Sequence, residues 1–383
     1  MISQQTQRNY NIFDLHEFLS VFAPLREIFS RKAQRQKGII SFANFSRFYC
    51  IFAPLFMMKV YRNGDSLPIF KNAVITIGTF DGVHTGHQQI IEQLKSEAHK
   101  IDGETVIITF DPHPRKIINA AAGIKLINTT EEKIELLAQK GIDHLVIVPF
   151  TEAFSKLTAE EYISEFLVKK FHPHTIIIGY DHRFGAGRKG DYHLLEDMSV
   201  FFHYVLREIP VHVLNAISVS STRIREAIAH ADIATANELL GYEFFFEGIV
   251  IEGNKLGRDI GFPTANLKIT NEEKLMPGDG VYAVEMSIIN DEGAIPEASP
   301  IMTTRSKNPE LKGMMNIGYR PTVDGTKKVT EVNIFDFNDN IYGKTLRVYV
   351  KKWLRGEQKF NGLDTLKQQL AKDKTDAMNY LGA

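Results

Sequence analysis

The chain has 383 residues, a formal net charge of −1 and 44% hydrophobic residues, a composition typical of folded globular domains. This charge balance disfavours a nucleic-acid-binding protein, which usually carries a basic excess. The single cysteine, Cys50, allows no disulfide within the chain, and no Cys/His cluster has zinc-site spacing. No apolar run reaches the about 20 residues of a membrane-spanning helix. We therefore expect a cytoplasmic protein without nucleic-acid or membrane partners.

Residues 1–57 differ from the rest of the chain. They are rich in phenylalanine at irregular spacing and carry more Lys and Arg than Asp and Glu. Exposed phenylalanines would form an aggregation-prone surface. We therefore expect a start codon assigned too far upstream, with translation beginning at Met57 or Met58. An organelle-targeting leader ranks lower because the serine content is modest, and a segment that binds a partner stays open.

In residues 58–241, predicted strands alternate with helices. Two helices begin with capping boxes, Thr129 with Glu132 and Thr158 with Glu161. Alternating strands and helices with apolar strands predict a Rossmann-like α/β domain with a doubly wound, parallel sheet. The predicted strands are Ala73–Ile77, Thr105–Phe110, His144–Val148, Thr175–Ile178 and His203–Val205.

The first predicted strand runs into Gly78-Thr79-Phe80-Asp81-Gly82-Val83-His84-Thr85-Gly86-His87, and a helix follows. Doubly wound sheets bind ligands at such turns, and a helix N-terminus attracts anions. His84 and His87 lie three residues apart, so both can donate to one phosphate. The turn resembles the His-x-Gly-His motif of nucleotidyltransferases, which implies that both histidines are catalytic. The nucleotide contacts implied with them are Gly78, Thr79, Phe80 and Gly82.

A second phosphate site is predicted at Val219-Ser220-Ser221-Thr222-Arg223-Ile224-Arg225, which precedes a helix. Hydroxyls at a helix N-terminus cap it and can bind phosphate, and an arginine can donate two charge-assisted hydrogen bonds to the same phosphate. A plain cap with solvated arginines is the structural alternative. The element resembles one that contacts ATP in FAD synthetases. The resemblance implies nucleotide binding by Ser220, Ser221, Thr222 and Arg225.

Two further segments resemble flavin-binding parts of FAD synthetases, Asp111-Pro112-His113-Pro114 and the stretch 179–191. The second contains Gly185-x-Gly187-x-x-Gly190, but it does not follow its strand directly, as a dinucleotide fingerprint does. His182 stands where the family usually has Phe, which leaves flavin packing there open. A proline-rigidified loop is the alternative for the first segment. The resemblance implies flavin contacts from Asp111, His113, Asp181 and Phe184.

Residues 242–383 have a different pattern, with several predicted strands and one terminal helix, Leu363–Tyr380. Strands separated by Gly, Pro and Asp/Asn turns predict a small antiparallel β-barrel with a C-terminal helix. The predicted strands are Phe244–Glu252, Val281–Ile289, Met314–Ile317, Val329–Phe337 and Thr345–Lys352.

The barrel sequence contains Gly253-Asn254-Lys255-Leu256-Gly257-Arg258-Asp259-Ile260-Gly261-Phe262-Pro263-Thr264-Ala265-Asn266-Leu267 and no P-loop motif. Thr264 and Asn266 offer two hard oxygen ligands that suit Mg²⁺ shared with phosphates, although a capped turn is the default for such residues. The string resembles the riboflavin kinase signature. That family implies metal and nucleotide binding by Thr264 and Asn266, and approach of Gly257 to the ADP phosphates. It also implies that Glu331 is the base that accepts the hydroxyl proton; Asn333 stands where the family commonly has His.

After Met58, nearly the whole chain resembles the bifunctional bacterial riboflavin kinase/FMN adenylyltransferase family. The resemblance implies phosphorylation of riboflavin to FMN and adenylyl transfer to FAD, with ATP as co-substrate and Mg²⁺ as cofactor. A chain with only one active module is an alternative, and His182 makes the adenylyltransferase the weaker module. A flavin-binding regulator with inactive sites is a second alternative, against which the retained histidines and Glu331 argue.

Overall fold

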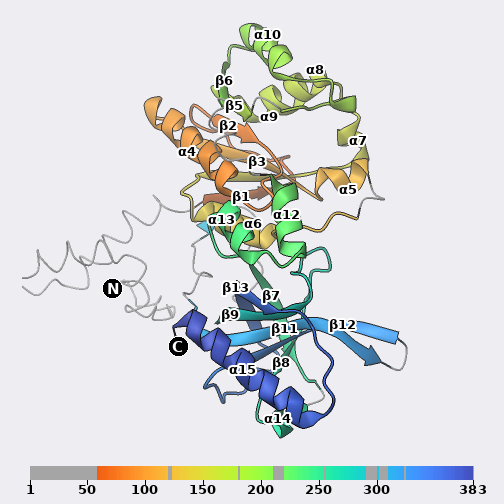
Figure 1. Cartoon of the computed structure of the whole chain (residues 1–383). Coiled ribbons are helices and arrows are strands. Elements are labelled where there is room, and N and C mark those ends of the chain that lie inside the picture. Colours follow the sequence, from red (N-terminus) through yellow and green to blue (C-terminus); the bar gives the residue numbers. More distant parts are fainter. Residues whose placement is uncertain are drawn as a thin grey trace, which may run out of the picture. The chain divides into compact units, whose positions relative to one another are not determined.

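The computed structural model has an α/β module followed by a β-barrel module (Figure 1). The expectations for residues 1–57 and for Asp181 fall outside the described residues. No helix in the described part is long and apolar enough to cross a lipid bilayer. The described residues are 58–119, 123–179, 182–209, 220–253, 256–289, 300–301, 309–322 and 325–382.

The α/β module is built on a sheet with the strand order β10-β1-β4-β3-β2-β5-β6. Strands β1 to β6 pair in parallel, which confirms the doubly wound sheet, and β10 adds an antiparallel edge. The edge strands β1 and β10 were not predicted, and β6 begins two residues later than expected. The bounds are β1 Met58–Arg62, β2 Val74–Ile77, β3 Thr105–Asp111, β4 His144–Pro149, β5 Thr175–Gly179, β6 Val205–Ile209 and β10 Pro300–Ile301.

Alternate strand residues enter two apolar clusters, one on each face of the sheet, as a period of two requires. Ile107 of β3 packs with α4 (Thr85–Lys100) and α6 (Thr130–Ala138). Its neighbour Ile108 packs in the cluster of the π-helical segment η3 (Tyr162–Val168) and α10 (Tyr192–Phe202). Both predicted capping boxes are present. The remaining helices are α5 Pro114–Ile118, α7 Glu152–Ser155, α8 Ala159–Glu161, α9 Lys169–Phe171 and η4 Ala186–Arg188.

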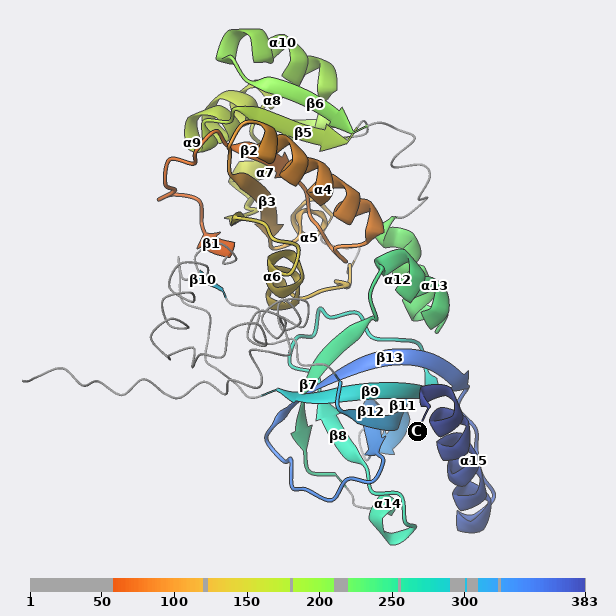
Figure 2. The same cartoon turned by 90° about the vertical axis from the view of Figure 1, so that its left-hand side faces the viewer.

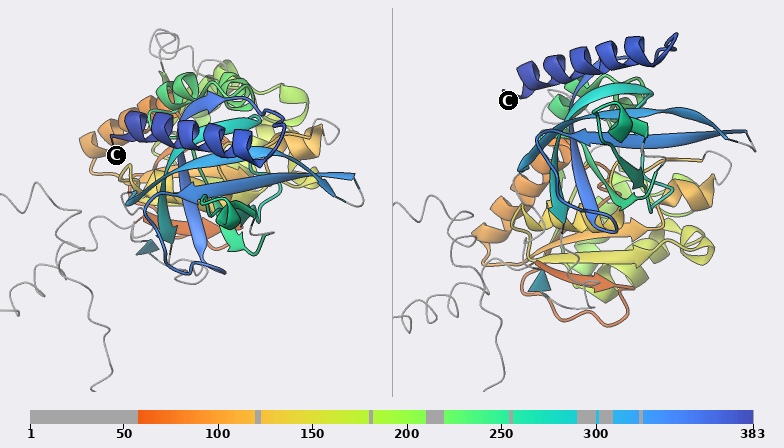
Figure 3. Two further views of the ribbon diagram at one scale, coloured as in Figure 1. Left: turned by 60° about the horizontal axis from the view of Figure 1, so that its bottom comes forward. Right: turned by 90° about the horizontal axis from the view of Figure 1, so that it is seen from below.

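The second module is a closed antiparallel barrel with the strand order β11-β12-β8-β7-β13-β9, as predicted. Helix α15 (Leu363–Leu381) packs on its outside through Ala377 (Figure 3). Strand β8, which carries part of the kinase signature, was not predicted. The other bounds are β7 Phe245–Ile251, α14 Leu256–Asp259, β8 Ala265–Lys268, β9 Gly280–Ile289, β11 Leu311–Thr322, β12 Gly325–Ile334 and β13 Thr345–Arg355.

Helices α12 (Ser221–Ala229) and α13 (Ile233–Leu240) share one apolar core with the barrel, and α13 lies beside β13 (Figure 2). Within this core, Leu240 and Phe246 are fully buried. The two helices therefore bury their apolar faces against the barrel, although they precede it in the sequence.

Buried ion pairs also join helix α6 to the barrel. Arg347 of β13 is 2% exposed and donates from both terminal nitrogens to Glu135, at 2.7 and 2.6 Å. Its Nε donates to Glu247 of β7 at 2.9 Å. Lys274, between β8 and β9, pairs with Glu132 at 2.5 Å. Helix α6 thus carries two charged junctions, one turn apart.

Candidate active sites

The first candidate site is the turn between β2 and α4, at the carboxyl edge of the sheet. His84 is the N-cap of α4, and its Nδ1 accepts a hydrogen bond from the backbone N–H of His87 at 3.3 Å. The two imidazole rings stack with their centroids 3.7 Å apart. Both predicted histidines therefore lie together at a helix N-terminus, where the helix dipole favours an anion.

Both imidazoles are neutral at pH 7. Burial lowers the pKa of His84 to about 4, against the opposing effect of Asp81. Burial and the neighbouring His84 lower the pKa of His87 well below its usual value. Because Nδ1 of His84 accepts a hydrogen bond, its proton lies on Nε2, which can donate. Nδ1 of His87 is buried and has no hydrogen-bond partner among the described residues, so a ligand oxygen can fill that role.

Small residues and one aromatic ring shape this turn. A Cβ on Gly86 would lie 3.2 Å from Nδ1 of His84, so the glycine lets the imidazole fold over the first helical turn. Gly82 adopts φ 93°, a conformation that favours glycine. Phe80 is 1% exposed, with its ring centroid 4.9 Å from that of His87. The Phe80 side chain therefore supports His87. Only the backbone of Phe80 is left for the predicted nucleotide contact.

Gly78 and Thr79 continue β2 toward the turn. The N–H of Gly78 donates to the carbonyl of Ile108 at 3.0 Å, and the carbonyl of Thr79 accepts from the Thr109 hydroxyl at 3.0 Å. Both predicted nucleotide contacts are therefore fixed against β3, and they lead the chain into the turn that carries the histidines.

Asp81 organises this turn, a role that sequence reasoning missed. It is 1% exposed and accepts hydrogen bonds from the backbone N–H groups of Ile127 and Asn128, at 3.0 and 3.1 Å. It also pairs with Arg225, whose Nε donates to the carbonyl of Lys125 at 2.9 Å. The predicted phosphate-binding arginine is therefore already anchored beside the histidines.

The predicted hydroxyls lie at the start of α12. Ser220 is the N-cap and accepts from the N–H of Arg223 at 3.2 Å. The hydroxyl of Ser221 donates to the carbonyl of Asp81 at 3.0 Å, and Thr222 is exposed. Ser221 and Arg225 thus both attach α12 to the histidine turn, which brings the two predicted phosphate elements together.

His113 and Asp111 also lie near this turn. Nδ1 of His113 accepts from the N–H of Arg115 at 3.2 Å, and burial lowers its pKa to about 4. The charge of Asp81 raises the pKa of the His113 imidazole, and the charge of Arg225 lowers it. Asp111 ends β3 and accepts from the hydroxyl of Thr130 at 2.8 Å. His113, predicted to contact flavin, is thus also a neighbour of the histidine turn.

Lys133 of α6 is a further candidate site residue that the sequence did not reveal. It is 7% exposed, and burial lowers the pKa of its ammonium, which in turn helps to depress the pKa of His87. Its Nζ makes one long hydrogen bond, 3.4 Å to the hydroxyl of Thr109, and no carboxylate of the described chain lies within 4 Å. The charges of Asp81 and Asp111 act on this ammonium from a greater distance, and a buried cation without a direct ion pair suits a phosphate ligand.

Phe184 is a core residue in this structure. Its side chain is 5% exposed and stacks on Tyr162 with ring centroids 5.0 Å apart. A Cβ on Gly190 would lie 2.3 Å from the ring, so the glycine makes room for it. The half-buried ring of His182 lies 5.8 Å from it. His182 is therefore the more accessible ring of this segment.

The second candidate site is a cavity of about 310 Å³ in the barrel. Gly257, Thr264, Asn266 and Glu331, all predicted from the sequence, line it. Strand β8 pairs with β12 in a register that places Asn266 opposite Glu331. The predicted metal ligand and the predicted base thus come from adjacent strands and face one cavity.

The loop around this cavity is held by a side chain of β12 and is closely packed at two glycines. Nδ2 of Asn333 donates to the carbonyl of Pro263 at 2.7 Å, which ties the Pro-Thr-Ala-Asn segment to β12. A Cβ on Gly257 would lie 2.3 Å from the carbonyl oxygen of Phe262, and one on Gly253 would lie 2.0 Å from Nδ2 of Asn266. Gly257 is therefore required by the loop backbone, and Gly253 leaves room for the Asn266 side chain.

The rest of the cavity combines apolar walls with a charged end, as ligand pockets commonly do. Arg355 lines it and is fixed by two hydrogen bonds to Asp373 of α15, at 2.9 and 2.7 Å. Arg355 and Glu357 are lining residues that the sequence did not single out. The apolar lining consists of Ile260, Phe262, Val281, Met314, Met315, Phe360, Leu366 and Leu370.

Each module matches one family model. Residues 67–223 match the FAD synthetase model, and residues 240–381 match the riboflavin kinase model. The chain is 35% identical to the bifunctional riboflavin kinase/FMN adenylyltransferase of Escherichia coli K12 over 312 residues, 82% of this chain and 94% of that protein. It is 36% identical to the protein of that name from Listeria monocytogenes over 313 residues, 81% of this chain and 92% of the relative.

A solved structure with the same architecture also matches. It is described as a macrolide-efflux protein from Streptococcus pneumoniae, with 31% identity and a TM-score of 0.71 over 84% of this chain and 99% of that one. Both modules and their order along the chain are thus shared with known proteins. The chain belongs to the family of bifunctional riboflavin kinases/FMN adenylyltransferases.

Proposed function

We propose that this chain makes FAD from riboflavin in two ATP-dependent steps. The barrel transfers the γ-phosphate of ATP to riboflavin, giving FMN and ADP. The α/β module then transfers AMP from a second ATP to FMN, giving FAD and pyrophosphate. The observation that carries this proposal is that each module presents its own cluster of transfer residues, the stacked histidines at α4 and the Asn266–Glu331 pair in the barrel cavity.

In adenylyl transfer, a phosphate oxygen of FMN attacks the α-phosphorus of ATP, and the bond to the β-phosphate oxygen breaks. Negative charge grows on the α-phosphate oxygens and on the leaving pyrophosphate. Nε2–H of His84 and Nδ1–H of His87 donate hydrogen bonds to these oxygens. The ammonium of Lys133 neutralises part of their charge. None of these groups needs to act as a nucleophile.

In the kinase step, Glu331 accepts the proton of the riboflavin primary hydroxyl while that oxygen attacks the γ-phosphorus. The hydroxyl of Thr264 and the carboxamide oxygen of Asn266 are hard ligands that fit Mg²⁺. When bound, the ion neutralises charge on the nucleotide phosphates. The apolar walls take the flavin ring, and Arg355 lies at the charged end of the cavity.

A time course tests this proposal. Purified protein is incubated with riboflavin, ATP and Mg²⁺, and the flavins are separated. FMN is expected first and FAD after it, with ADP and pyrophosphate as co-products. Formation of FMN without FAD would show that only the kinase module is active. The replacement of the family's usual Phe by His182 would give a reason for that outcome. Flavin binding without ATP turnover would instead identify a regulator.

A further inference from the structure

Residues 125–128 link the histidine turn to the barrel. On one side, the N–H groups of Ile127 and Asn128 donate to the carboxylate of Asp81. On the other, the barrel segment 271–276 runs alongside. The N–H of Leu126 donates to the carbonyl of Glu273 and the N–H of Leu275 to the carbonyl of Leu126, both at 2.7 Å. The barrel thus supports the backbone that holds Asp81.

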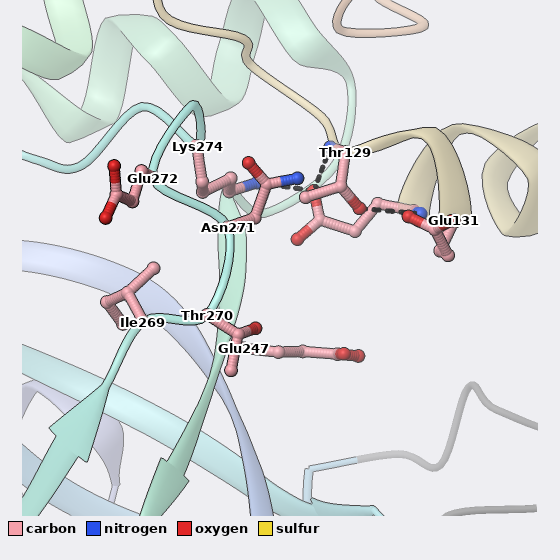
Figure 4. A pocket seen from close by; sticks show the side chains of 9 residues that line it. Thr129, Glu131, Glu247, Ile269, Thr270, Asn271, Glu272 and Lys274 are labelled. Atoms are coloured by element: carbon pink, nitrogen blue, oxygen red, sulfur yellow. Dashed lines mark hydrogen bonds and ion pairs between the residues drawn. The ribbon is translucent and has the colours of Figure 1, made fainter.

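Lys274 makes the side-chain contact in this support. It belongs to the barrel module, yet its Nζ donates to the carbonyl of Ile127 at 2.7 Å and pairs with Glu132 of α6 at 2.5 Å. Figure 4 shows it reaching toward the Thr129 end of α6. It is 4% exposed, beside a cavity of about 420 Å³ that Glu131, Glu247 and Glu272 also line. Both polar partners of this barrel residue therefore lie in the α/β module.

We propose that Lys274 of the kinase module is a positioning residue for adenylyl transfer. Its ammonium fixes the Ile127 carbonyl, which keeps the N–H groups of Ile127 and Asn128, on either side of it, directed at Asp81. Asp81 in turn anchors Arg225 and the turn that ends in His84. This inference rests on the proposed adenylyltransferase activity, and it makes the adenylyl site incomplete without the barrel.

A second junction provides a matched control. Arg347 also is buried, also belongs to the barrel and also pairs with α6, through Glu135. Among the described residues, its side chain makes no hydrogen bond or ion pair with residues 125–128 or with Asp81, so it docks the modules without touching the histidine turn. A role that is only docking predicts the same result for both junctions, whereas a positioning role predicts a difference.

The test compares two double variants, Lys274→Met/Glu132→Gln and Arg347→Met/Glu135→Gln. Each removes both charges of a pair, so that no carboxylate is left buried without a partner. FAD formation from FMN and FMN formation from riboflavin are measured on the same full-length preparation. In the Lys274 double variant, kcat for FAD formation is expected to fall about 10- to 100-fold, because misplaced reacting groups cost about 100-fold. Its KM for FMN and its kinase rate are expected to stay within about twofold.

In the Arg347 double variant, both activities are expected to fall equally or not at all. Normal FAD formation in the Lys274 double variant would overturn the proposal. Equal loss of both its activities would also overturn it, because that indicates a structural role. The same selective loss in the Arg347 double variant would show that docking alone matters. Failure of the unmodified chain to convert FMN to FAD would instead refute the proposed function.

Discussion

We propose that the two stacked histidines of the α/β module act as a pair of neutral donors. Their rings stack, and burial keeps the pKa of each below its usual value. His84→Ala and His87→Ala are each expected to lower FAD formation from FMN about 100- to 1000-fold, the usual cost of removing one preorganised donor. Flavin separation measures FAD, and the kinase rate on riboflavin is the internal control. Equal loss of both activities would show that the sites are not independent.

Glu331 is expected to give the opposite result. In Glu331→Gln, riboflavin phosphorylation should fall about 100- to 10,000-fold, because the hydroxyl loses its proton acceptor. Added FMN should still be converted to FAD. The exposed barrel residue Glu310 provides the control variant, Glu310→Gln. Normal phosphorylation by Glu331→Gln would remove this residue from its assigned role.

His84 and His113 link the site to the pH dependence of folding. Both have a pKa of about 4 in the folded chain, chiefly because of burial, against 6.5 for an ordinary histidine. The unfolded chain therefore binds protons more tightly at these positions. Their stabilising contribution is complete above about pH 6.5 and is lost as pH falls toward 4. Urea unfolding across this window should show a weaker pH dependence in His113→Gln than in the control His193→Gln, which changes an exposed histidine. Identical dependence in both variants would contradict this assignment.

At the scale of a single element, α4 depends on a glycine in its first turn. Alanine is a better helix former by about 1 kcal/mol, so Gly86→Ala favours the helix itself. The added Cβ would, however, lie 3.2 Å from the His84 imidazole and displace it. We expect an unchanged or higher melting temperature together with at least tenfold slower FAD formation, a misplacement effect. Normal FAD formation would show that the His84 ring can adjust without loss.

Elements defined by local patterns were predictable, and those defined by distant partners were not. The capping boxes at Thr129 and Thr158 and the strand at His144 follow from adjacent residues. Strand β8 escaped prediction because it has only four residues and its register depends on β12, far along the chain. His203, predicted to open a strand, instead ends α10 in a left-handed conformation with φ 60°.

The same distinction holds within the candidate sites. His84 and His87 share one turn and could be paired from the sequence alone. Asp81 and Lys133 could not be assigned, since their roles depend on partners from other segments, such as Arg225 and Thr109. No local pattern shows that a charged side chain becomes buried, because burial is a property of the assembled modules.

At the scale of the whole molecule, buried charge joins the two modules. Arg347 lies between Glu135 of α6 and Glu247 of β7. Burial lowers the pKa of its guanidinium, but the hydrogen bonds to Glu135 and the charges of both carboxylates outweigh burial and raise it. In Arg347→Met, Glu135 is left buried without a counter-ion. The free energy of unfolding is therefore expected to fall by about 3–5 kcal/mol, the usual cost of breaking a buried pair from one side.

The companion variant Arg347→Met/Glu135→Leu separates charge from packing. It replaces the buried pair by two apolar side chains and leaves only Glu247, which is 27% exposed and can reach water. It should recover most of the lost stability, because an apolar pair often equals or exceeds a buried ion pair. Urea denaturation of the single and double variants measures the difference. If the double variant is as unstable as Arg347→Met, then lost packing around Arg347, and not the unpaired Glu135 carboxylate, accounts for the effect.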